Sequence, residues 1–171
     1  MILSYLSMLI LVVLSNYLVQ FPINDWLTWA MFPYPCTFFV NELTNRIYGP
    51  NQARKVVYGG FVMAVILSFW VASPQIAFAS GTAFLVAQLL DISLFSRLRN
   101  ASWWVAPFVA SFLASAVDTC IFWPLAFMGE TSLPIWTWGF SDFLVKVACD
   151  LLLLTPYRYI IRKVTTPVAL S

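Results

Sequence analysis

The chain has 171 residues, of which 61% are hydrophobic and 9% are charged, with a formal net charge of +2. Soluble domains carry about a quarter charged residues, and the mean hydropathy here is +0.85, so these residues cannot cover a water-facing surface. The composition predicts an integral membrane protein with one domain, residues 1–171, and no soluble domain that could bind nucleic acid.

Several kinds of chemistry are excluded by residue type. The chain has no His, which removes the commonest metal ligand and the usual general base. Cys36, Cys120 and Cys149 stand singly in apolar segments, which favours buried apolar side chains over a disulfide or metal site. No nucleotide-binding loop of the G-x-x-x-x-G-K-[ST] kind is present. Paired aspartates would be the remaining route to an intramembrane enzyme, and we expect no enzyme, no cofactor and no metal.

Apolar runs predict an all-α bundle of six transmembrane helices. In chain order they cover about 2–18, 26–47, 56–72, 76–95, 103–127 and 136–160. Each has about 17 to 25 residues, enough to cross a hydrocarbon core of about 30 Å. The connections are short, so neighbouring helices should be antiparallel.

Basic residues gather at alternate helix ends. Eight of the nine Lys and Arg lie at or after the end of the second, fourth or sixth predicted helix: Arg46, Arg54, Lys55, Arg97, Arg99, Arg158, Arg162 and Lys163. Because short basic loops stay on the cytoplasmic side, this pattern predicts that both termini are cytoplasmic.

The second predicted helix is interrupted in its first half by Pro33 and Pro35. Irregular backbone inside a membrane is tolerated only where it is buried in protein or lines a cavity. The break therefore favours a binding site near residues 33–37.

Polar residues inside the predicted spans form stripes. A charge at mid-membrane costs about 2.5 to 3.5 kcal/mol on insertion scales, yet Asp142, Lys146 and Asp150 share one face of the sixth helix. Mixed stripes on the fourth and fifth helices comprise Ser80, Phe84, Gln88 and Asp91, and Ser111, Ser115, Asp118 and Phe122. A bundle can turn these stripes inward around a wet cavity.

A purely structural interpretation stays open for some of these charges. Asp142 and Asp150 could bracket Lys146 at i±4 as a neutralised group that only joins helices. Glu42 and Arg46, also four residues apart, could form a simple surface ion pair.

The run PCTFFVNELTNRIYGPNQAR, residues 35–54, resembles the motif of the vitamin uptake transporter family, in its bacterial queuosine-precursor branch. The family usually has Asp where this chain has Glu42. The likeness continues through Ser15-Asn16-Tyr17-Leu18-Val19-Gln20, Gln88, Leu90-Asp91, Phe95, Arg97-Leu98-Arg99, Trp103-Trp104, Ala106-Pro107, Asp118-Thr119, Asp142 and Lys146-Val147.

This resemblance implies a six-helix importer of 7-deazaguanine bases, the precursors of queuosine in tRNA, in the bacterial cytoplasmic (inner) membrane. Such a base presents an N1–H and an exocyclic amine to a carboxylate, an O6 to a donor and a ring face to an aromatic side chain. Candidate residues are Asp118 or Glu42 for the N–H edge, Asn45, Gln88 or Lys146 for O6, Phe38 or Phe122 for stacking, and Asp142 for an aminomethyl cation, with Asp91 also a substrate-binding candidate.

One alternative function is a substrate-capturing subunit of an ATP-driven uptake system, because six-helix vitamin carriers of similar size work that way. The sequence leaves open whether protons, sodium or trapping of the substrate drives uptake. It also leaves open a homodimer.

Overall fold

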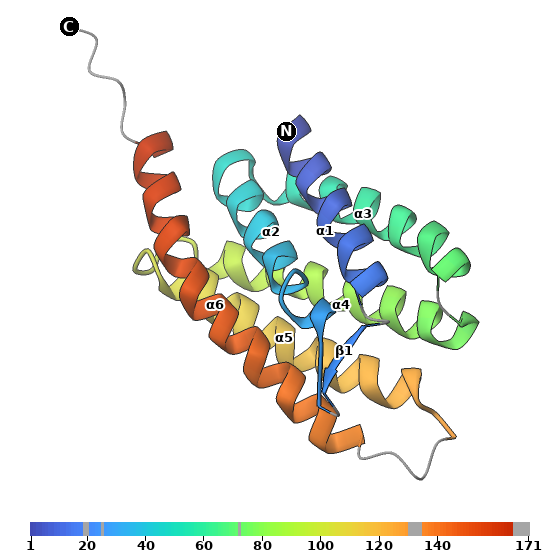
Figure 1. Cartoon of the computed structure of the whole chain (residues 1–171). Coiled ribbons are helices and arrows are strands. Elements are labelled where there is room, and N and C mark those ends of the chain that lie inside the picture. The colour runs from blue at the N-terminus through green and yellow to red at the C-terminus, as the bar shows by residue number, and fades with distance from the viewer. Residues whose placement is uncertain (19–20, 25, 72, 130–134, 166–171) are drawn as a thin grey trace, which may run out of the picture.

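The computed structural model describes the chain except for residues 19–20, 25, 72, 130–134 and 166–171. The described residues form six α-helices: α1 Ile2–Leu18, α2 Pro35–Tyr48, α3 Pro50–Val71, α4 Pro74–Leu98, α5 Val105–Ala126 and α6 Ile135–Thr165 (Figure 1). Of these, α4 and α5 are long and apolar enough to cross a membrane by length and composition, and α1 is a shorter apolar helix. The all-α class is therefore confirmed, whereas the number of spans and the side of the termini stay predictions.

Small residues set the closest packing in the bundle, between α4 and α5. Alanines recur every four residues on the two facing surfaces and are buried: Ala79, Ala83 and Ala87 on α4, and Ala106, Ala110 and Ala114 on α5. Small side chains at this spacing let two helix backbones approach closely, as in membrane bundles generally. This pair forms a platform on which α3 and α6 also pack.

The short helix α2 lies in the middle of the fold, against α1, α3, α4 and α6 (Figure 1). Its polar side chains are buried on several sides, and they bond to α4 rather than to water. Asn41 Nδ2 donates to Asp91 Oδ2 at 2.8 Å, and Asn45 Nδ2 donates to the Ile92 carbonyl at 3.2 Å. A polar helix can occupy this central place because neighbouring helices satisfy its hydrogen bonds.

The start of the second predicted span is wrong. Strand β1, Pro22–Asn24, pairs antiparallel with β2, Leu27–Thr28, and the 3-10 helix η1, Trp29–Met31, follows. The Asn24 side chain accepts the backbone N–H groups of Trp26 and Leu27, both at 2.9 Å, which stabilises a turn instead of a helix. The α-helix begins only at Pro35, in its first turn, where the missing N–H of proline has no cost.

The alternative of a surface ion pair between Glu42 and Arg46 does not match the described residues, whose salt bridges involve Lys146. The Arg46 guanidinium donates to the backbone carbonyl of Arg99 at 2.7 Å, and Arg99 donates to the carbonyl of Arg46 at 2.7 Å. These reciprocal bonds join the end of α2 to the residue after α4. Glu42 is instead buried in the bundle.

Candidate functional site

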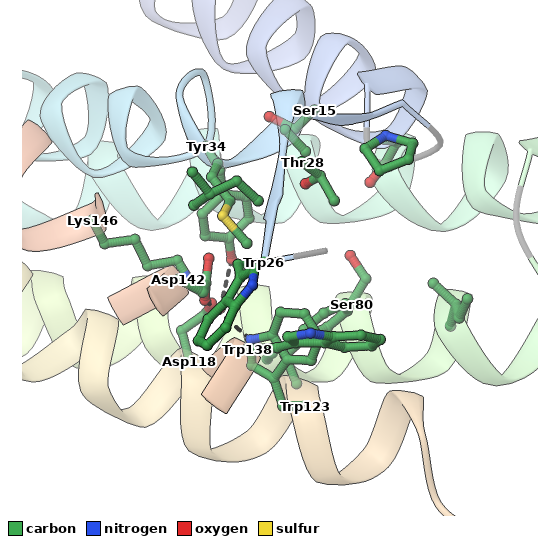
Figure 2. A pocket seen from close by; sticks show the side chains of 18 of the residues that line it. Ser15, Trp26, Thr28, Tyr34, Ser80, Asp118, Trp123, Trp138, Asp142 and Lys146 are labelled. Atoms are coloured by element: carbon green, nitrogen blue, oxygen red, sulfur yellow. Dashed lines mark hydrogen bonds and ion pairs between the residues drawn. The ribbon is translucent and has the colours of Figure 1, made fainter. Parts of the chain in front are cut away.

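A cavity of about 650 Å³ lies beside the β1–β2 hairpin. The end of α1, η1 with Tyr34, the first half of α4, the second half of α5 and the first half of α6 supply the rest of its lining. Pockets that bind small molecules usually measure about 300 to 1,000 Å³. Figure 2 shows side chains from the hairpin and from the helices converging on this space.

Charged side chains form one wall of the cavity (Figure 2). Lys146 of α6 is only 3% exposed, and its Nζ lies 2.7 Å from Asp118 Oδ2 of α5 and 2.5 Å from Asp142 Oδ2 of α6. The alternative that Asp142 and Asp150 bracket Lys146 holds for Asp142 only, because the second carboxylate, Asp118, comes from the neighbouring helix. A buried cation with two carboxylates is retained only if hydrogen bonds satisfy the remaining lone pairs.

Neighbouring side chains supply those hydrogen bonds. The Tyr34 hydroxyl donates to Asp118 Oδ1 at 2.6 Å. The Thr119 hydroxyl donates to Asp142 Oδ2 at 3.0 Å and accepts from Lys146 at 3.2 Å, and the Trp123 indole N–H donates to Asp142 Oδ2 at 3.3 Å. The charged cluster Asp118–Asp142–Lys146 is therefore held in one arrangement by side chains of α5 and by Tyr34.

Aromatic side chains form the adjoining wall. Trp123 stacks on Phe127 with ring centroids 5.4 Å apart, and Trp138 meets Trp123 edge-on at 5.7 Å. Phe122 and the hairpin residue Trp26 also line the cavity. Flat apolar rings beside fixed charges suit a planar ligand that has a polar edge.

Four of the predicted substrate-binding residues line this cavity: Asp118, Phe122, Asp142 and Lys146. The break near residues 33–37 also reaches it, through Tyr34. The sequence analysis did not name Tyr34 as a candidate. Its position between Pro33 and Pro35, at the predicted helix break, could have identified it. Trp123 and Trp138 were interpreted only as markers of the membrane interface, because their spacing does not reveal that they meet.

The other predicted residues lie outside the cavity. Phe38 is fully buried in the core, and Gln88 Nε2 donates to Thr37 Oγ1 at 2.7 Å. Asn45 donates to the Ile92 carbonyl, and Asp91 accepts from Asn41, both across the contact between α2 and α4. Glu42 lines a second, much smaller cavity. The part that all nine residues play in substrate binding stays a prediction.

Among the described residues, no group of three or more His, Cys, Asp or Glu side chains is placed to hold a metal ion. In the charged cluster the Lys146 ammonium donates to Asp118, Asp142 and Thr119, and the two carboxylates have further lone pairs that can accept hydrogen bonds.

Residues 28–73 and 68–161 match the sequence profile of the family described as "Putative vitamin uptake transporter". The chain belongs to this family. The resemblance drawn from the sequence is therefore confirmed, and the protein is a membrane transporter. No solved structure matches the chain significantly.

Three curated relatives of this vitamin uptake transporter come from bacteria. It is 30% identical to the "Queuosine precursor transporter" of Escherichia coli, over 86% of this chain and 80% of the relative. It is 31% identical to the "Probable queuosine precursor transporter" of Haemophilus influenzae, over 83% and 77%. The Bacillus subtilis protein of the same description is 31% identical over 76% and 69%.

Proposed function

We propose that this transporter imports queuosine precursors, the 7-deazaguanine bases, across the bacterial inner membrane through a single domain of six spanning helices. The names of the three relatives support this substrate class. The observation that carries the proposal within the chain is the charged cluster Asp118–Asp142–Lys146 beside an aromatic wall in one cavity.

The cluster offers hydrogen-bonding groups in the order that a guanine-like edge requires. Such an edge presents an acceptor, O6, next to two donors, N1–H and the exocyclic amine. Lys146 is a donor, and it lies beside the Asp118 carboxylate, a double acceptor, at 2.7 Å. Its three N–H groups bond to Asp118, Asp142 and Thr119, so a bond to O6 would replace one of these. Each carboxylate oxygen has about two lone-pair directions, so Asp118 can accept from the base while it keeps the Tyr34 hydroxyl.

The remaining groups of the cavity fit the rest of such a ligand. Phe122 can stack on the ring face, since it lines the cavity on the same helix as Asp118. Asp142 can accept from an aminomethyl cation, because its only basic neighbour within 4 Å among the described residues is Lys146. Adenine has no N1–H and presents an amine where guanine has O6, so it would place a donor against Lys146.

The arrangement of the chain supports a topology with both termini in the cytoplasm. In Figure 1 the N-terminus, the turn between α2 and α3 and the end of α6 lie toward one end of the bundle. The hairpin, the end of α5 and the start of α6 lie toward the other end. In this topology the cavity faces the outside, where the substrate enters.

Nothing in the chain or in its relatives favours the alternative of a capture subunit for an ATP-driven system. A homodimer is compatible with the proposal and is not required by it, because the described residues of one chain enclose the cavity.

Uptake of a radiolabelled 7-deazaguanine base by cells that cannot make queuosine precursors tests the function. We expect uptake to depend on the transporter, with guanine competing and adenine not competing. Asp118→Asn should weaken binding several-fold to about a hundredfold, since a lost hydrogen bond to a buried charge costs about 1 to 3 kcal/mol.

A matched aromatic pair tests the stacking role. Phe122→Leu should lower affinity, whereas Phe112→Leu should not, because Phe112 lies on the same helix but packs against Phe108 and Phe143 away from the cavity. Equal competition by adenine and guanine, or wild-type affinity in Asp118→Asn, would contradict the proposed recognition.

A further inference from the structure

A second cavity lies between α2, α5 and α6, apart from the large one. Its free space is about 10 Å³, at the lower limit of what one water molecule needs. Two acidic side chains line it, Glu42 from α2 and Asp150 from α6, together with Ser111 from α5 and apolar residues. None of these side chains lines the large cavity.

Both carboxylates are deeply buried and incompletely bonded. Glu42 is 5% exposed and Asp150 is 6% exposed. Glu42 Oε1 and Asp150 Oδ2 each have no hydrogen-bond partner in the described part of the chain. The salt bridges found there involve Lys146 with Asp118 and Asp142, so neither Glu42 nor Asp150 has a basic partner within 4 Å.

The electrostatic surroundings do not supply a counter-charge at close range. Glu42 lies within electrostatic reach of two further carboxylates, Asp91 on α4 and Asp150, and near the Ser111 hydroxyl. Other titratable or charged groups interact electrostatically with Glu42, with Asp150 or with side chains next to them. They come from α2, from α6 and from the turn after α4: Cys36, Arg46, Arg99, Lys146, Cys149 and Tyr157. Of the cations, Lys146 is already bonded to two other carboxylates, and Arg46 and Arg99 donate to backbone carbonyls.

A buried ionised carboxylate without a partner is too costly to persist, and two close carboxylates cannot both stay ionised. We propose that Glu42 and Asp150 form a proton-binding site that takes up one proton on one side of the membrane and releases it on the other in each transport cycle. The step is the reversible protonation of a carboxylate, so it needs no other reactant. This inference rests on the proposed transport function and adds its energy source.

A proton fits this site better than a metal cation. A hard cation such as Ca²⁺ or Mg²⁺ takes about six or more oxygen ligands, whereas this cavity is lined by two carboxylates and by two hydroxyl-bearing side chains, Ser111 and Tyr157, in a space of about 10 Å³. No group of three acidic side chains suited to a metal ion occurs among the described residues.

The same two helices connect this site to the large cavity. Helix α2 begins directly after Tyr34, which bonds to Asp118, and it carries Glu42 two turns later. Helix α6 carries Lys146 of the charged cluster, with Asp150 one turn beyond it. A change in charge between Glu42 and Asp150 therefore alters the contact between α2 and α6. Of these two helices, α6 carries Asp142 and Lys146, and α2 follows directly on Tyr34.

The first test needs no substrate. Infrared difference spectra of the purified protein between alkaline and acidic pH should contain a carboxylic-acid C=O band that is reduced in Glu42→Gln and in Asp150→Asn. Thr44→Ala is the matched control, because Thr44 is a buried polar residue of α2 whose hydroxyl bonds to its own helix at Val40. If the C=O band is the same in wild type, Glu42→Gln and Asp150→Asn, the two carboxylates do not form a proton-binding site.

The second test uses proteoliposomes and labelled neutral 7-deazaguanine. An inward proton gradient of about one pH unit should sustain accumulation of up to about tenfold for one proton per substrate. Asp150→Asn should bind the base and exchange it across the membrane, but should not accumulate it, and Glu42→Gln should also lose accumulation. Glu42→Asp should retain accumulation, and Thr44→Ala should behave as wild type.

The outcomes separate this inference from the proposed function. If the wild-type protein does not bind the base, the proposed substrate is wrong, and the infrared test still decides the proton site. If it binds and transports the base with no response to a proton gradient, or responds to a sodium gradient instead, the proton site is wrong and the substrate stands.

Discussion

Replacing Lys146 by Met should separate the structural role of the charged cluster from its role in transport. The Lys146 ammonium is 3% exposed and bridges two carboxylates, Asp118 and Asp142. Its removal leaves both carboxylates buried without a cation, which costs about 3 to 5 kcal/mol in comparable buried pairs. For a chain of this length that cost corresponds to a fall in Tm of about 6 to 20 °C.

The assay is thermal unfolding of the purified protein in detergent, measured together with uptake. Lys163→Met is the matched control, because Lys163 is exposed near the end of the same helix and should change the Tm little. Adding Asp142→Asn to Lys146→Met removes one unpaired charge, so the double variant should recover about half of the lost stability. Uptake should stay absent in both variants, since neither can donate to the substrate.

Two results would refute this reasoning. A Tm in Lys146→Met as high as in the Lys163→Met control would mean that the buried ion pairs do not stabilise the bundle. Recovery of uptake in the double variant would mean that Lys146 joins helices only and takes no part in binding.

Three further predictions follow from individual contacts. Tyr34→Phe removes the donor at 2.6 Å from the cavity carboxylate and should lower substrate affinity several-fold with little loss of Tm, and unchanged affinity in a binding assay would contradict this role. Gly60→Ala places a Cβ 2.8 Å from Met8 Cγ, whereas a Cβ at Gly59 would lie 3.4 Å from its nearest atom. Gly60→Ala should therefore lower the free energy of unfolding by about 1 to 3 kcal/mol, and Gly59→Ala should leave the Tm unchanged. A cysteine at Gln75, which the proposed topology places outside, should react with a membrane-impermeant thiol reagent added to intact cells, and reaction only after lysis would reverse the topology.

The helices could largely be predicted, because apolar length follows directly from composition. Their ends could not, since polar residues continue a helix beyond its apolar part: α3 begins at Pro50, six residues before the predicted start. Residues 26–34 were predicted as helix because they belong to an apolar run. The turn at Asn24 overrides that tendency, since its side chain bonds to the backbone two and three residues ahead.

The partners of the buried charges could not be predicted at all. Helical periodicity places Lys146 and Asp150 on one face of α6, but it does not say which helix lies opposite each turn. The structure places Asp118 beside Lys146, and it places Asp150 with Glu42 at a separate cavity. A stripe that looks continuous in the sequence is therefore divided between two sites.

The shortness of α2 has a consequence for the route of a polar solute. Its 14 residues measure about 21 Å along the helix axis, against about 30 Å for the hydrocarbon core of a bilayer. The missing length is replaced by the hairpin and by η1, beside which the large cavity lies. In the proposed topology, a substrate bound at Asp118 would already have passed the level of the hairpin and η1, so the conformational change would have to carry it only across the remainder of the hydrocarbon core.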